Sequence, residues 1–234
     1  MKQITSIICI LFLIGNVFSQ KEIQLAVELS NTYSTERFYG RSRGDFNGIK
    51  LAIGSRFNTN KGNVTLYGMY EFSGLVLKQS IYTLQSHKIG GGINYRILNN
   101  KKRFSPFIEI NASTEVATNY RGGFLHIDQF FPTDYGGFWE KDGPPSQYYS
   151  AFYYSTPFVG NILLGCDVRL EDGLHLNVGA GYGLRGMKTR EIYWDEGTEP
   201  SEELRNVDPK FTKWFNMIDV KLGISYAFSF KKKQ

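Results

Sequence analysis

The chain has 234 residues and a formal net charge of +5, and at this length a single domain is expected. No apolar run after residue 20 is long enough for a spanning helix, which excludes a helical membrane protein. A protein of this composition can cross a membrane only as β-strands, whose polar halves account for a mean hydropathy of -0.30. Part of the positive charge lies on Lys2 and on Lys231 to Lys233, which favours a membrane interface and no nucleic acid as partner.

The N-terminus has the pattern of a secretory signal peptide. Lys2 provides the basic start, and the apolar run from Ile7 to Ile14 is too short for a membrane span. Ser19 is a small residue at the expected cleavage site, so we expect a signal peptide at residues 1–19 and one barrel domain at residues 20–234. Cleavage would leave Cys166 as a single cysteine, which excludes an internal disulfide.

Segments with a period of two predict an all-β chain of eight strands, each apolar on one face and small or charged on the other. The last strand shows this best, because apolar residues alternate with polar or small ones from Ile218 to Phe230. The eight strands are expected at about residues 23–29, 46–57, 64–72, 84–97, 108–112, 158–170, 174–184 and 214–230.

The connections between the predicted strands alternate in length. Turn-forming residues make short connections at residues 58–63, 99–102 and 171–173, and the other connections are longer. Short periplasmic turns and long outer loops are typical of outer-membrane barrels. The sequence therefore predicts an eight-stranded antiparallel up-and-down transmembrane β-barrel with long extracellular loops and both termini in the periplasm.

An eight-stranded barrel is just wide enough for side chains to fill its interior. The inward positions carry seven basic and five acidic residues, and this near balance predicts mutual pairing in a plugged lumen. Glycines at inward positions, such as Gly92 and Gly179, leave room for long side chains opposite, and Cys166 is expected to face lipid. The predicted inward charges are Glu28, Lys50, Arg56, Glu71, Lys88, Arg96, Glu109, Asp167, Arg169, Arg185, Asp219 and Lys221.

The sequence contains no recognisable catalytic, cofactor-binding or metal-binding pattern. Its three histidines, His87, His126 and His175, show neither metal-ligand spacing nor the order of a catalytic triad. Ser86 and His87 are adjacent near the predicted outer rim, but neighbours on a strand point to opposite faces and cannot form a dyad. We therefore expect no enzyme activity and no cofactor.

Residues 118–156 are predicted to form a long irregular outer loop, and this loop is rich in aromatic side chains. It can contribute to the aromatic girdle of the outer interface, or form an ordered cap that binds a partner. The candidate partner-binding residues are Tyr120, Phe124, Phe130, Phe131, Tyr135, Phe138, Trp139, Tyr148, Tyr149, Phe152, Tyr153 and Tyr154.

The glycine- and aromatic-rich segments GGGINYRI (residues 90–97) and VGAGYGLRG (residues 178–186), with the aromatic last strand, are the most characteristic parts of the chain. Together with the signal peptide they resemble the small outer-membrane β-barrel families, namely OmpA-like, OmpX-like and PorT-like barrels, over residues 21–230. The resemblance implies a place in the outer membrane of a Gram-negative cell. Unlike many such barrels, the chain continues after the last aromatic residue, Phe230, with Lys231 to Gln234.

The leading hypothesis is an integral outer-membrane protein with a structural, adhesion or partner-binding role through its outer loops. Its expected partners are the lipid bilayer, with lipopolysaccharide, a protein or a glycan at those loops. Three alternatives stay open: an accessory barrel of a secretion or surface-assembly complex, a lipid-modifying outer-membrane enzyme, and a soluble exported barrel that binds a small ligand. The soluble barrel would need its charged face to point outward.

Overall fold

The computed structural model describes residues 21–35, 45–59, 62–76, 83–98, 103–130, 147–195, 198, 201–207 and 212–229. The predicted signal peptide and Phe230 with the basic tail lie outside these residues. The described elements are β1 (Lys21–Ser34), β2 (Asp45–Asn58), β3 (Asn63–Val76), β4 (Thr83–Arg96), β5 (Phe104–Thr118), β6 (Phe124–Phe130), β7 (Gln147–Arg169), β8 (Leu174–Asp195), α2 (Glu202–Asn206) and β9 (Thr212–Ser229).

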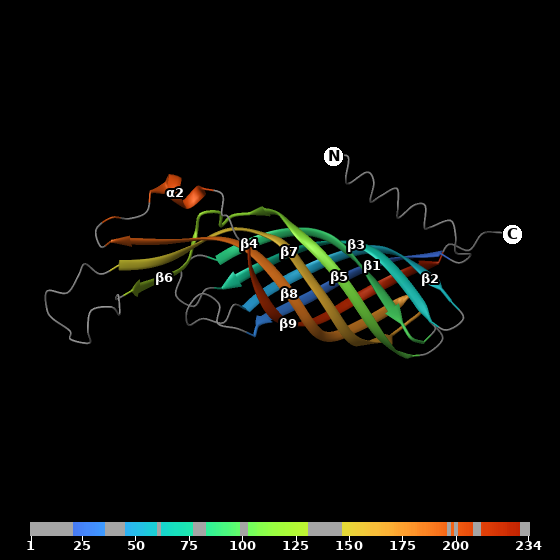
Figure 1. Ribbon diagram of the computed structural model, residues 1–234. Helices are drawn as coiled ribbons and strands as arrows, with labels where there is room; N and C mark the ends of the chain where they lie inside the picture. Colours follow the sequence, from blue (N-terminus) through green and yellow to red (C-terminus); the bar gives the residue numbers. More distant parts are fainter. Residues whose placement is uncertain are drawn as a thin grey trace.

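Eight of these strands close into an antiparallel barrel, as the sequence predicted (Figure 1). Strands that follow one another along the chain pair with each other from β1 to β5, that is, β1 with β2, β2 with β3, β3 with β4 and β4 with β5. In the same way, β7 pairs with β8 and β8 pairs with β9. Two further pairings, β5 with β7 and β1 with β9, complete the circle. In the second of these Leu25 lies opposite Tyr226, so the last strand is the closing partner of the first.

The two faces of the barrel differ in chemistry. Outward apolar side chains such as Leu25, Ile53 and Leu164 are 44%, 60% and 62% exposed, whereas the inward charges Lys88 and Glu109 are 0% and 1% exposed. An apolar outside around a charged interior matches lipid outside and a polar lumen inside. The chain therefore folds as an outer-membrane β-barrel. This arrangement overturns the soluble-barrel alternative, which needed the charges outside.

The short turns β2–β3, β4–β5 and β7–β8 share one end of the barrel with the start of β1 and the end of β9. This end is periplasmic by the rule that outer-membrane barrels have short turns there. The other end carries the longer connections and faces outward. A positive φ of 83° at Gly173 makes the Asp172–Gly173 turn possible between β7 and β8.

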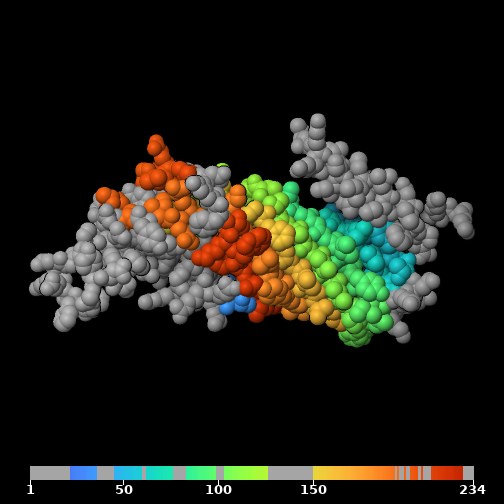
Figure 2. Space-filling view, viewed as in Figure 1, coloured from blue at the N-terminus to red at the C-terminus, as the bar shows by residue number. Residues whose placement is uncertain are grey.

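The predicted irregular loop at residues 118–156 is wrong in part, because it contains β6 and the first ten residues of β7. The β7–β8 ladder continues beyond the barrel to the pair Gln147–Asp195, and β6 pairs with the outer part of β7. We call this three-stranded extension, made of residues 124–130, 147–156 and 188–195, the projection. Figures 1 and 2 show β8 and α2 reaching beyond the outer end of the barrel.

The helix α2 is short and is capped at its N-terminus by Ser201, whose hydroxyl oxygen accepts a hydrogen bond from the Leu204 amide. The described part of the chain contains no helix long and apolar enough to span a membrane.

Candidate functional site

Four charged side chains form a closed ring of ion pairs in the middle of the lumen, which we call the ionic ring. Lys50 of β2 lies 2.5 Å from Glu28 of β1 and 3.3 Å from Glu109 of β5. Lys221 of β9 lies 3.1 Å from Glu28 and 2.5 Å from Glu109. Because β1 and β5 are four strands apart in a circle of eight, they stand on opposite walls. The ring therefore bridges the full width of the barrel.

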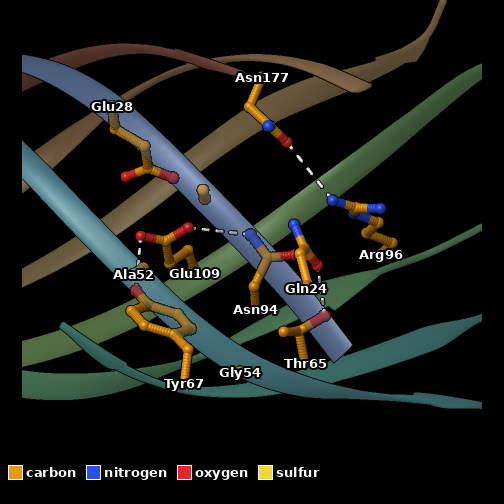
Figure 3. A pocket seen from close by; sticks show the side chains of 11 residues that line it. Gln24, Glu28, Ala52, Gly54, Thr65, Tyr67, Asn94, Arg96, Glu109 and Asn177 are labelled. Atoms are coloured by element: carbon orange, nitrogen blue, oxygen red, sulfur yellow. Dashed lines mark hydrogen bonds between the residues drawn. The ribbon is translucent and has the colours of Figure 1, made fainter. Parts of the chain in front are cut away.

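Neutral donors hold Glu109 in the ring (Figure 3). The Tyr67 hydroxyl donates to it at 2.8 Å and the Asn94 side-chain amide at 2.9 Å. The side-chain amide of Asn111 also donates to it, at 3.1 Å. A buried charge is tolerated only where partners offset its loss of water. This network provides such partners and confirms the predicted mutual pairing inside the lumen.

Inward glycines provide the space that these long side chains need, as the sequence predicted. A Cβ atom on Gly92 would lie 2.6 Å from the Tyr67 hydroxyl oxygen and 2.6 Å from the Ile110 carbonyl oxygen. Tyr67 can therefore reach Glu109 only because position 92 has no side chain. The cavity beside this group is small, at about 20 Å³, so the lumen is closed at the ring.

A second polar layer lies between the ionic ring and the periplasmic mouth. Arg96 is 2.7 Å from Asp167, whose other carboxylate oxygen lies 2.6 Å from Nδ1 of His175. The Arg56 guanidinium donates to Gln24 at 2.9 Å. Arg169, which was also predicted to point inward, lies at the rim with its side chain 37% exposed and 3.9 Å from Asp172.

Above the ionic ring, the outer end of the barrel is filled by apolar side chains, which we call the outer plug. The guanidinium of Arg185 lies 3.6 Å from the ring centroid of Phe46, so the plug meets the charged layer through a cation–π contact. The plug consists of Phe46, Leu75, Leu84, Tyr120, Leu125, Ala151, Tyr153, Met187, Phe215 and Met217, all of which are buried.

Sequence reasoning missed the outer plug, although a signal for it was present. Residues an even number of positions apart on a strand point to the same face. Phe46 therefore shares the inward face of β2 with Lys50, Met187 shares that of β8 with Arg185, and Phe215 is also at an inward position of β9. Apolar residues thus replace charged ones at inward positions near the outer strand ends. That change in pattern indicates a dry outer end.

Glu115 anchors the projection to the barrel. Its carboxylate accepts hydrogen bonds from Ser86 Oγ at 2.6 Å, from the Thr156 amide at 3.3 Å and from the Tyr153 hydroxyl. The exposed rings of Phe158 and Trp214 pack edge to face on the outer surface, with their centroids 5.9 Å apart. Burial, and then the nearby Glu115 carboxylate, raise the pKa of the Tyr153 hydroxyl well above its usual range, so it acts as a donor to Glu115.

Side-chain contacts also order the projection itself. The rings of Phe124 and Phe152 pack 4.4 Å apart between β6 and β7. The Trp194 indole nitrogen donates to Ser150 Oγ at 2.8 Å, and the Arg121 guanidinium lies 3.9 Å from the Tyr154 ring. The projection is therefore a packed sheet in its described part.

The predicted partner-binding aromatics occupy several environments. Tyr120, Phe152 and Tyr153 are buried, at 7%, 0% and 0% exposure, and stabilise the plug and the base of the projection. Phe124 and Tyr154 are partly exposed on the projection. The structure describes only the backbones of Phe130, Tyr148 and Tyr149, which belong to β6 and β7. The remaining four, Phe131, Tyr135, Phe138 and Trp139, lie outside the described residues. Their role in partner binding stays a prediction.

Ser86 and His87 point to opposite faces, as predicted. Ser86 is buried in the lumen against Glu115, whereas His87 faces outward and its Nδ1 lies 2.6 Å from the Tyr70 hydroxyl. His175 lies in the lumen. Within the described ranges, no three His, Cys, Asp or Glu side chains gather as a metal site.

No family model and no curated protein matches the chain. Among solved structures it is similar to neisserial surface protein A, at 11% identity over 89% of this chain and 97% of that one, with a TM-score of 0.43. It is similar to a major outer membrane protein from Thermus thermophilus, at 12% identity over 89% and 99%, with a TM-score of 0.41. It is also similar to the outer membrane enzyme PagL, at 11% identity over 87% and 98%, with a TM-score of 0.37.

Proposed function

We propose that this protein acts at the outer surface of the outer membrane, as an adhesion or partner-binding barrel whose lumen does not carry solutes. The observation that carries the proposal is the division of the molecule into a closed barrel and an ordered projection. The barrel supplies a rigid base, and the projection presents side chains above the lipid.

The closed lumen argues against transport. The ionic ring joins opposite walls, and the outer plug fills the outer end with side chains such as Leu75 and Met187, both 0% exposed. A solute would have to break paired buried charges and displace packed apolar groups, and both steps are costly. Function is therefore expected outside the barrel.

The projection argues for contact with a partner. The strands of the projection extend beyond the barrel, and their ordered residues do not help the chain to span the membrane. Binding residues are often carried on segments that a rigid scaffold positions, and the links from Glu115 to Ser86 and Tyr153 fix this segment to the barrel. Aromatic side chains at its surface suit a protein or glycan surface.

Conductance tests the closed lumen. The folded protein in planar bilayers is expected to show no stable conductance in about 1 M KCl, where the Debye length is about 3 Å and surface charges are screened. A variant with the ring and plug opened together, Glu109→Ala with Met217→Ala, is expected to conduct more often. Steady open channels in the unaltered protein would contradict the closed lumen.

A deletion tests the projection. Gly123 and Tyr153 are hydrogen-bonded neighbours, with the Tyr153 amide 2.9 Å from the Gly123 carbonyl. Joining them directly removes residues 124–152 and leaves the barrel strands whole. Cells bearing this variant are expected to lose surface attachment and to lose adducts with a photo-crosslinker placed at Trp194.

The control for this deletion is a crosslinker placed at Thr59 in a periplasmic turn, which should yield no adduct with an outer partner. Equal attachment by cells with and without residues 124–152, at equal amounts of folded barrel, would refute the proposal.

A further inference from the structure

The strand β6 forms one edge of the projection. From His126 to Phe130 its backbone pairs with β7 and with no other strand of the described part of the chain, and β6 is the last strand in the sheet order (Figure 1). The free edge of such a strand is a template for a further strand. The sequence of β6, FLHIDQF, contains no lysine, arginine or proline, the residue types that commonly protect an edge from pairing.

The opposite edge of the projection is better protected. There β8 continues beyond Lys188–Thr212, its last pair with β9, and the sequence at this edge includes Lys188, Arg190 and Glu191. Lys213 of β9 lies 3.6 Å from Glu191. Charged side chains discourage pairing at an edge. Of the two edges, β6 is therefore the one whose sequence permits a further strand.

The sequence of β6 is self-complementary in an antiparallel arrangement. With Ile127 at the centre, Ile127 of one copy is opposite Ile127 of the other, and His126 is opposite Asp128 on both sides. A histidine can donate a hydrogen bond to a carboxylate, whereas like charges directly opposite each other destabilise a sheet. Moving the centre to Asp128 would place two carboxylates opposite each other. A short segment with apolar and aromatic residues, low net charge and no proline is also typical of strands that pair with themselves.

Strand direction decides where the second copy must be. Figure 1 shows the projection continuing along the long axis of the barrel, which runs across the membrane. The two-fold axis that relates two antiparallel strands reverses the direction of the strands and of the barrels that carry them. Barrels in one membrane all point the same way, so this pairing cannot form within one membrane. The two copies must lie in two membranes that face each other.

We propose that β6 joins this protein to a second copy on a neighbouring cell, through antiparallel pairing of the two β6 edges. The inference rests on the proposed role at the outer surface and names its partner. A strand of 7 residues provides a small interface, and interfaces of small area are weak. Many copies on two cell surfaces act together, and this multivalency strengthens the attachment.

Mixing two cell populations tests the partner. Cells with two different fluorescent labels display the full-length protein at equal surface amounts, and flow cytometry counts the mixed clusters. Mixed clusters are expected only when both populations carry the protein. Ile127→Lys places two like charges opposite each other and should reduce clustering at least about fivefold. Lys188→Gln, at the other edge of the projection, should change clustering less than about twofold, because a distant exposed charge is screened.

Exchanged charges test the register and show that the variants are folded. His126→Asp places acids opposite acids, and the double variant His126→Lys with Asp128→Lys places bases opposite bases. Each population should cluster poorly with itself, but the two populations should cluster with each other, because every acid then faces a lysine.

Mixed clusters with cells that lack the protein, or failure of the two charge variants to cluster with each other, would overturn the inference. So would equal clustering by Ile127→Lys and Lys188→Gln. If removing residues 124–152 abolishes attachment to other surfaces, but cells that all carry the unaltered protein do not cluster, the proposed function stands and this inference fails.

Discussion

At the scale of single residues, Glu109 decides how the lumen is closed. It pairs with Lys50 and Lys221 and accepts hydrogen bonds from Tyr67 and Asn94. These partners come from four strands, so one carboxylate joins much of the barrel wall. The ring it completes has two acids and two bases and is neutral, which is why it can be fully buried.

Replacing Glu109 by Gln leaves Lys50 and Lys221 sharing a single buried carboxylate. Removing one member of a buried ion pair typically costs about 3–5 kcal/mol, and we expect a loss of unfolding free energy of about 3 kcal/mol. Urea unfolding in lipid vesicles measures this. Lys213→Gln breaks the exposed pair with Glu191 and should cost under about 1 kcal/mol; similar losses in both variants would argue against a stabilising ring.

Gly92 tests the packing around the ring. In Gly92→Ala the new methyl group would lie 2.6 Å from the Tyr67 hydroxyl oxygen and from a backbone carbonyl. Such overpacking costs about 1–3 kcal/mol, so the urea midpoint should fall. Gly68→Ala is the matched control, because the nearest atom to its new methyl would be 4.0 Å away, and an unchanged midpoint in both variants would refute the steric argument.

At the scale of elements, the β7–β8 hairpin has two parts with different environments. From Val159 to Val168, β7 lies between β5 and β8 in the barrel. Before the bulges at Tyr153–Phe158, its neighbours are β6 and β8. The Glu115 contacts lie at this junction. The projection is therefore attached to the barrel by one continuous ladder and one buried polar cluster.

Tyr153→Phe should loosen the junction and leave the barrel intact. The change removes the hydroxyl that bonds Glu115 and lies 2.8 Å from Thr156 Oγ1. Hydrogen exchange followed by mass spectrometry should show faster exchange at residues 147–156, with residues 159–169 unchanged. Tyr154→Phe keeps the ring that stacks on Arg121 and should change neither; faster exchange in both segments of Tyr153→Phe would mean that the barrel depends on the junction.

At the scale of the whole molecule, the apolar belt places the barrel in the membrane. On β2 the outward residues Ile49, Leu51 and Ile53 are 47%, 50% and 60% exposed, and Asn47 follows toward the outer end. The belt thus ends where the polar outer rim begins. Unheated and heated samples of such a barrel should migrate differently on a denaturing gel.

Leu51→Arg should weaken the folded, membrane-inserted state by about 2–4 kcal/mol, because a cation near the middle of the lipid face is poorly solvated. Asn47→Arg, on the same strand at the rim, should cost about 0–1 kcal/mol. Folding yield into vesicles and urea midpoints measure both. Equal effects at the two positions would place the bilayer elsewhere on the barrel.

The number of barrel strands, the direction of each face and the balance of lumen charges could all be predicted from the sequence. These follow from a period of two, which is local and visible in runs such as Ile218 to Phe228. The tertiary structure alone decided that Glu28, Lys50, Glu109 and Lys221 form one ring, that His175 meets Arg56, and that β7 and β8 continue beyond the membrane. Such contacts join residues up to 193 positions apart, and they depend on strand register and barrel closure, which local periodicity does not specify.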